Sequence, residues 1–317
     1  MNQKLGGHLA IISANVIFGA SIPITKSLLD TWITPEAYTV LRLVFGAVIF
    51  WSIGIFSKKE KVTNKDLLVI GIGGIFGFIA TQLLFAIALQ YTTPVYFSLL
   101  MSLTPVLVLF LSFIFLKELL NRNKVIGVIL SIAGAAIIIL CGKSGGMAEN
   151  NMLGIILAFL AALSYAIYII ITRNISKKYS PITLTKWTFL LSAALLVPFG
   201  ITDLPSQKIF QGDVPVIPIM QLGYALIFAT AIGFLLMPVG LKRLKATTVS
   251  IYINFLPIVA SIIAIIIGQD LFSWDKPIAA ILVISGVIMV SRKPSEMKKS
   301  NVKKKGSALS YKYEYQN

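Results

Sequence analysis

The sequence has almost none of the side chains that build metal centres and catalytic triads. Its 317 residues include one cysteine, Cys141, and one histidine, His8. An internal disulfide and a zinc site of cysteine and histidine ligands are therefore excluded. No Walker motif and no G-x-G-x-x-G motif occurs, so nothing in the sequence indicates binding of ATP or a dinucleotide. We expect no metal, no cofactor and no enzymatic activity.

Charged residues are also scarce. Only 13% of the residues are charged and 57% are hydrophobic, with a mean hydropathy of +0.87, whereas soluble domains carry about 25% charged residues. A water-soluble fold is therefore close to excluded. About 20 helical residues span the roughly 30 Å core of a bilayer. Ten apolar runs of comparable length lie near 8–28, 35–56, 67–90, 94–116, 124–142, 152–172, 182–201, 217–240, 247–268 and 276–291.

The second half of the chain repeats the first at a spacing of 152 residues. Among the residues that recur are Leu89 as Leu241, Pro105 as Pro257, Gly134 as Gly286 and, conservatively, Glu118 as Asp270. Each half contains five apolar runs, an odd number, so the halves cross a bilayer in opposite directions. Inverted repeats of this kind place a binding site at the bilayer midplane. We predict an all-α polytopic membrane protein with ten transmembrane helices, built as two inverted five-helix repeats at 1–145 and 146–293.

The basic residues indicate the orientation, because short loops rich in lysine and arginine stay in the cytoplasm. With the N-terminus inside, most of the 28 basic residues fall on the inner side, and few, such as Lys26 and Lys208, fall outside. We expect a multi-pass protein of the bacterial plasma membrane with both termini cytoplasmic. Residues 294–317 are predicted to form a disordered basic cytoplasmic tail. This tail fits a solvated topogenic segment, or one attracted to anionic lipids, better than a nucleic-acid ligand.

Two matching polar stripes lie in the fourth and ninth apolar runs, since helical residues three or four apart share a face. They consist of Ser98, Ser102 and Pro105 in one run and Ser250, Asn254 and Pro257 in the other. The serines fit either a cavity or helix packing with hydroxyls bonded to their own i−4 carbonyls. An amide has more polar groups to satisfy, so Asn254 is predicted to line a cavity. The two prolines predict kinks, which either act as hinges or shape the cavity.

Further polar side chains lie deep in other runs. Asn15 and Gln82 are predicted to line the cavity, while Tyr165 and Tyr168, one helical turn apart, fit either an organic ligand or core packing. Arg42 is the one cation about two turns inside a run, where a central charge costs about 2.5–3.5 kcal/mol. We assign it a structural role, with snorkelling to the outer interface as the alternative.

These features resemble the drug/metabolite transporter superfamily, in particular its EamA family. The resemblance covers about residues 8–291 and rests on Pro35 through Leu41-Arg42, Thr104-Pro105, Leu116-Lys117-Glu118, Gly127 and Gly134, echoed by Leu256-Pro257, Asp270 and Gly286. It implies a central cavity near Phe18, Gln82, Ser102, Tyr165, Tyr168 and Asn254. The chain departs from the family at two positions: it has Phe18-Gly19 where many members have Trp-Gly, and it has Asp270 where glutamate is usual.

The expected function is secondary transport of a small organic solute, an amino acid or a related metabolite, outward across the plasma membrane by alternating access. All twelve acids lie in loops, tails or ends of runs, which favours zwitterionic or neutral amphipathic solutes over polycations. The alternatives are a broad-specificity drug exporter and, less favoured, a membrane-embedded lipid-modifying enzyme. The expected partners are the solute and the lipid bilayer, with a homodimer left open and no nucleic acid.

Overall fold

The computed structural model describes residues 3–116, 122–141, 151–244, 249–250 and 252–291, and all regular structure within them is helical. The first half contains the uninterrupted helices α1 (Gln3–Leu29) and α2 (Pro35–Ile55). The next segment joins α3 (Asn64–Gly74), the π-helix η1 (Ile75–Ala80) and α4 (Thr81–Tyr91) end to end. The helices α5 (Pro94–Met101), α6 (Thr104–Leu116) and α7 (Arg122–Cys141) follow.

The second half has a similar order of long helices, with additional short elements between them. It begins with α8 (Asn151–Thr172), the short α9 (Ile175–Lys178) and α10 (Pro181–Gly200), and the 3₁₀ turn η2 (Lys208–Phe210) follows. The next segment joins α11 (Val216–Gly223), the π-helix η3 (Tyr224–Gly233) and α12 (Phe234–Arg243). The described chain then contains the 3₁₀ turn η4 (Tyr252–Asn254), α14 (Phe255–Ile266) and α15 (Asp275–Ser291).

Seven helical segments in the described residues are long and apolar enough to cross a membrane. They are Lys4–Leu29, Pro35–Ile55, Asn64–Tyr91, Pro94–Phe115, Met152–Thr172, Pro181–Gly200 and Val216–Arg243. Helices α7, α14 and α15 occupy the three remaining positions of the ten apolar runs, and α14 and α15 have only 12 and 17 residues. The all-helical, multi-pass architecture is confirmed. The count of ten spans and their inverted arrangement stay predictions.

Three helices begin with the same local device. The side chains of Thr34, Thr93 and Ser180 accept a hydrogen bond from the backbone N–H three residues ahead, and a proline follows each of them at the first helical position. The hydroxyl satisfies one of the free N–H groups of the first turn, and the proline has no N–H to satisfy. This combination sets where α2, α5 and α10 start after short connections.

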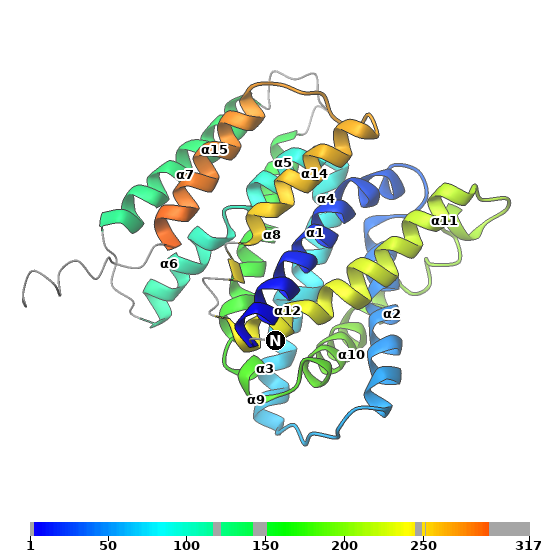
Figure 1. Ribbon diagram of the computed structural model, residues 1–317. Helices are drawn as coiled ribbons and strands as arrows, with labels where there is room; N and C mark the ends of the chain where they lie inside the picture. Colours follow the sequence, from blue (N-terminus) through cyan, green and yellow to red (C-terminus); the bar gives the residue numbers. More distant parts are fainter. Residues whose placement is uncertain (1–2, 117–121, 142–150, 245–248, 251, 292–317) are drawn as a thin grey trace, which may run out of the picture.

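Elements of the two halves pack mainly against each other. Helices α7 and α15 lie side by side (Figure 1), α2 packs on α10, and α4 packs on α8. Helix α1 contacts α12, η3 and α14. The principal core cluster accordingly contains residues of both halves, including Phe50, Phe78, Phe189 and Phe234. Large exposed apolar side chains such as Phe199 cover the outside of the helices, as a surface in contact with lipid requires.

Candidate functional site

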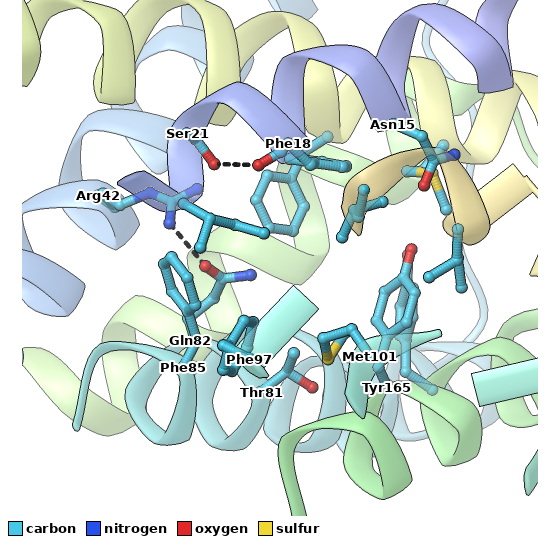
Figure 2. A pocket seen from close by; sticks show the side chains of 16 residues that line it. Asn15, Phe18, Ser21, Arg42, Thr81, Gln82, Phe85, Phe97, Met101 and Tyr165 are labelled. Atoms are coloured by element: carbon cyan, nitrogen blue, oxygen red, sulfur yellow. Dashed lines mark hydrogen bonds between the residues drawn. The ribbon is translucent and has the colours of Figure 1, made fainter. Parts of the chain in front are cut away.

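A cavity of about 70 Å³ lies where helices of both halves meet (Figure 2). One water molecule needs about 10–15 Å³ of such space, so the cavity holds several waters or a solute of a few heavy atoms. The walls come from α1, α2, α4, α5, α8, α12, η4 and α14. The lining residues are Asn15, Phe18, Ser21, Ile22, Arg42, Thr81, Gln82, Phe85, Phe97, Met101, Tyr165, Tyr168, Phe234, Met237, Ile253 and Leu256.

Five of the seven residues expected at a substrate cavity line this one. They are Asn15 and Phe18 of α1, Gln82 of α4, and Tyr165 and Tyr168 of α8. The two tyrosine rings stack with centroids 5.8 Å apart and planes inclined by 25°. The structure therefore brings together residues that are more than 140 positions apart in the chain. Their contact with a substrate stays a prediction.

Ser102 and Asn254 do not belong to the cavity wall. Ser102 is fully buried, and its hydroxyl donates to the Ser98 carbonyl at 3.2 Å, the bonding expected of a packed serine. Asn254 ends η4, and its Oδ1 is buried without a hydrogen-bond partner among the described residues. The prediction that both line the cavity assumed continuous helices. Ser102 follows the end of α5, and Asn254 lies in the turn before α14, so both stand where the helices are interrupted.

The two prolines follow breaks in their helices. Helix α5 ends at Met101 and α6 begins at Thr104, which makes Pro105 the second residue of α6. Pro257 is the third residue of α14, directly after the turn η4. The missing N–H of each proline therefore falls in a first turn, where no i−4 carbonyl awaits it. The expected kinks within continuous helices are replaced by breaks, and a hinge role for the prolines stays a prediction.

Arg42 also lines the cavity, which was not predicted from the sequence. Its side chain does not snorkel outward: the residue is 4% exposed, and its guanidinium lies against the cavity. Nε donates to Thr230 Oγ1 at 2.8 Å and Nη1 to Gln82 Oε1 at 2.6 Å (Figure 2). The guanidinium carbon lies 5.3 Å from the Tyr38 ring centroid and 5.6 Å from that of Phe234.

Among the described residues Arg42 forms no ion pair, and it is the one charged residue of the cavity wall. A membrane-embedded charge is a functional-site candidate by default, because charge is expensive there. The position of Arg42 two turns inside an apolar run was the sequence signal for such a site. The run does not show which face of the helix packs against protein, so the cavity contact could not be predicted from it.

The π-helical segments widen two helices beside the cavity, and π-helical turns frequently occur at functional sites. Thr81 Oγ1 donates to the Phe76 carbonyl at 2.6 Å, and Thr230 Oγ1 donates to the Ala225 carbonyl at 2.8 Å, each five residues back. Both hydroxyls thus satisfy carbonyls within or next to a π-helix. Thr81 lines the cavity, and Thr230 in addition accepts the hydrogen bond from Arg42.

Two glycines in the π-helices admit aromatic rings of the cavity wall. A Cβ atom at Gly77 would lie 2.5 Å from the Tyr168 ring, and one at Gly233 would lie 2.7 Å from the Phe18 ring. Phe18 packs edge-on against Phe234 with centroids 5.4 Å apart. Only glycine allows these rings to approach the neighbouring backbone so closely. The site therefore combines aromatic walls with one cation, two amides and tyrosine hydroxyls, a set suited to hydrogen bonding a small polar solute.

Comparison with known proteins gives the family. The model of the EamA-like transporter family matches residues 5–140 and 152–292. The uncharacterized transporter YyaM of Bacillus subtilis is 26% identical over 295 residues, covering 91% of this chain and 94% of its own length. An uncharacterized transporter of Archaeoglobus fulgidus is 30% identical over 264 residues, covering 83% of this chain and 90% of its own.

A protein of known crystal structure shares the fold. It superimposes with a TM-score of 0.61 at 21% identity, over 88% of this chain and 98% of its own. The resemblance noted in the sequence is thereby confirmed by a family match in both halves. The chain belongs to the EamA-like transporter family, and the protein is a multi-pass membrane transporter.

Proposed function

We propose that the protein is a secondary transporter that exports a small organic solute, an amino acid or a related metabolite, across the plasma membrane by alternating access. The observation that carries the proposal is the composition of the cavity wall. The first half of the chain contributes α1, α2, α4 and α5 to the wall, and the second half contributes α8, α12, η4 and α14. A site between two halves opens to alternate sides when the halves rock against each other.

The packing of the helices supports an inverted arrangement of two five-helix repeats, 1–145 and 146–293. Under the repeat, α8 corresponds to α1, and α12 corresponds to α4. The contact of α1 with α12 is accordingly matched by the contact of α8 with α4. The pairs α2–α10 and α7–α15 each join corresponding helices across the two halves. This pattern is the one expected for ten spans related by an axis in the membrane plane.

Contacts between loops support the proposed sidedness, in which both termini lie in the cytoplasm. Two loops assigned to the inside meet where Ser180 N–H donates to Glu60 Oε2 at 2.9 Å. Two loops assigned to the outside meet where Ile209 N–H donates to the Trp32 carbonyl at 3.1 Å. A second outer contact joins Gln269 Nε2 to the Pro23 carbonyl, near the end of α1, at 3.0 Å. Loops given the same side by their basic residues thus lie together.

The breaks ahead of Pro105 and Pro257 offer the places at which the halves bend. An interrupted helix lacks part of its i→i−4 ladder, so its two parts are free to change their relative direction at low cost. Both breaks occur at corresponding positions of the two halves, beside Ser102 and beside Asn254. We assign the motion of alternating access to these two points and to the adjoining helices α1 and α8.

The test begins with the solute. Metabolites in the medium of a deletion strain are compared with those of a strain that overproduces the protein, and solutes enriched by overproduction are then tested for flux in proteoliposomes. The variants Tyr165→Phe and Asn15→Leu should slow the flux, while Ser206→Ala, in an exposed loop, should not. If no solute changes between the strains and none of the tested solutes is transported, the proposal is wrong. Flux of many unrelated compounds would instead identify a broad drug exporter.

A further inference from the structure

We propose that the solute carries a carboxylate, which binds Arg42 at one end of the cavity. The inference rests on the proposed function, because the ligand is taken to be the transported solute. It goes further in naming a chemical class, a small amphipathic monocarboxylic acid. The argument uses the charge of the wall, the free hydrogen-bonding groups at each end and the apolar surface between them.

The charge of the wall comes first. Arg42 is the one charged residue among those that line the cavity, and no described carboxylate pairs with it. A cation taken out of water is stabilised best by an anion at hydrogen-bond distance. The planar guanidinium matches the two oxygens of a carboxylate and binds them with parallel hydrogen bonds. An anionic group entering the cavity therefore finds the counterion that the protein leaves unpaired.

The donors around Arg42 are only partly used. A guanidinium has five N–H donors, and the hydrogen bonds with described residues involve Nε, to Thr230, and Nη1, to Gln82. Gln82 Oε1 accepts from Arg42, which fixes the orientation of the amide and leaves Nε2 as a donor. In Figure 2 this nitrogen points away from Arg42 along the cavity. Arg42 and Gln82 thus form an end of the cavity rich in N–H donors.

The other end of the cavity offers acceptors. Asn15 Nδ2 donates one of its two N–H groups to the Ile11 carbonyl at 2.8 Å, and its Oδ1 is an acceptor. Figure 2 shows Oδ1 of Asn15 and the hydroxyl of Tyr165 directed toward the same space. This end suits an ammonium, amide or hydroxyl group, and it has no cation to neutralise a second carboxylate. The wall therefore favours a monocarboxylic acid over a dicarboxylic acid.

Apolar surface separates the two ends. Phe18, Phe85, Phe97 and Met101 line the cavity between Arg42 and Tyr165. These side chains form hydrophobic contacts with a hydrocarbon or aromatic body and offer it no polar partner. The wall as a whole is therefore complementary to an acid with a short apolar part and a hydrogen-bond donor.

The experiment uses thermal unfolding of the purified full-length protein in detergent. The probes are L-alanine, L-valine and butyrate, each paired with its primary amide, and succinate as a dicarboxylic acid. A ligand that binds the folded state raises the melting temperature, and the rise grows with the ratio of ligand concentration to Kd. We expect at least one of the three monocarboxylic acids to raise it, with at least tenfold higher apparent affinity than its own amide and than succinate.

The informative variant is Gln82→Glu, because it is isosteric with the native side chain. The new carboxylate lies next to Nη1 of Arg42 and takes the place of the ligand's anion, while the cation and the fold remain. We expect this variant to unfold at or above the wild-type temperature and to lose the preference for acid over amide. Arg42→Met should lose the same preference, and Arg42→Lys should keep part of it. Lys186→Gln, which removes a cation of α10 that does not line the cavity, should behave as the wild type.

Each outcome either supports or overturns the inference that the solute carries a carboxylate. Equal stabilisation by acids and amides, stabilisation by none of the acids, or an undiminished preference in Gln82→Glu overturns the inference. Acid binding that depends on Arg42 but is not followed by flux supports the inference and contradicts the transport proposal. Flux of a solute without a carboxylate that Arg42→Met leaves unchanged supports transport and overturns the inference.

Discussion

Nη1 of Arg42 lies 2.6 Å from Oε1 of Gln82, and this hydrogen bond joins α2 to α4 at the wall of the cavity. The second hydrogen bond of the guanidinium, to Thr230, adds the π-helix η3 of the other half. One cation thus links three segments of the chain through neutral partners. Buried charges are usually neutralised by an acid, so the use of an amide and a hydroxyl leaves a positive potential in the cavity.

Replacing Thr230 by valine tests how much the Arg42 contact stabilises the fold. Valine keeps the shape of threonine but leaves Nε of Arg42 without its acceptor, and hydrogen bonds to charged groups contribute about 1.5–3 kcal/mol. We expect the free energy of unfolding in detergent to fall by about this amount. Thr185→Val is the matched control, since Thr185 is also buried and only donates to the Pro181 carbonyl four residues back. Equal losses in both variants would contradict the assigned role of Thr230.

A methyl group at Gly77 should disturb the cavity. It would lie 2.5 Å from the Tyr168 ring, and overpacking of this kind costs about 1–3 kcal/mol. We expect Gly77→Ala to lower the melting temperature and to slow the flux of the transported solute. Gly223→Ala is the control, because no atom lies within 4 Å of its Cβ position and alanine favours helix by up to about 1 kcal/mol. If Gly223→Ala were destabilised as well, the loss of stability in Gly77→Ala could not be attributed to crowding of the Tyr168 ring.

Glu60 predicts a pH dependence of stability at the contact of two loops. Burial by itself raises the pKa of this carboxyl, but the Ser180 N–H, the hydroxyls of Thr183 and Ser180 and the charge of Lys242 together hold it below 4.5. A carboxyl group whose pKa is lower in the folded state than in the unfolded chain stabilises the fold at pH values above the unfolded pKa. This stabilisation is lost as the pH falls through the lower, folded value.

The measurement compares the melting temperatures of wild type and Glu60→Gln as a function of pH. We expect the variant to be less stable at pH 7 and the difference to shrink as the pH falls below about 4.5, the window set by the carboxyl group. Glu36→Gln, at an exposed position in the first turn of α2, should show a smaller difference at pH 7. A difference for Glu60→Gln that is independent of pH would contradict the prediction.

Cysteine labelling tests the proposed sidedness. In a Cys141→Ser background, Lys59→Cys and Ser206→Cys place single thiols at exposed loop positions. A membrane-impermeant maleimide applied to intact cells should label position 206 and should label position 59 only after permeabilisation. Labelling of both positions in intact cells, or of position 59 alone, would contradict the orientation.

The helices could be predicted from the sequence to within a few residues. Long apolar runs leave the backbone no partner but itself, and the pairs Thr34-Pro35 and Ser180-Pro181 mark two helix starts in a way that sequence alone can identify. Asn15, Gln82 and the two tyrosines were found because polar side chains deep in such runs must face protein. The basic tail at 294–317 lies outside the described residues.

Other parts of the site could not be predicted, for physical reasons. Residues at helical spacing share one face only while the helix is continuous. The helix is interrupted after Met101, and the Ser102 hydroxyl donates to the Ser98 carbonyl of its own segment. The π-helices depend on packing across the two halves, which the local sequence does not encode. Arg42 was not placed at the cavity because the sequence shows its depth in the apolar run but not the helix that faces it. Thr230, its partner, lies 188 residues away.

The π-helices have a mechanical consequence. Each wide turn holds more residues than an α-helical turn, and successive α-helical residues are rotated by about 100°. If η1 tightened into an α-helix, the residues of α4 would rotate about the helix axis relative to those of α3. Gln82 and Phe85 would then swing away from the solute, so a local change of winding is enough to dismantle one side of the binding chamber.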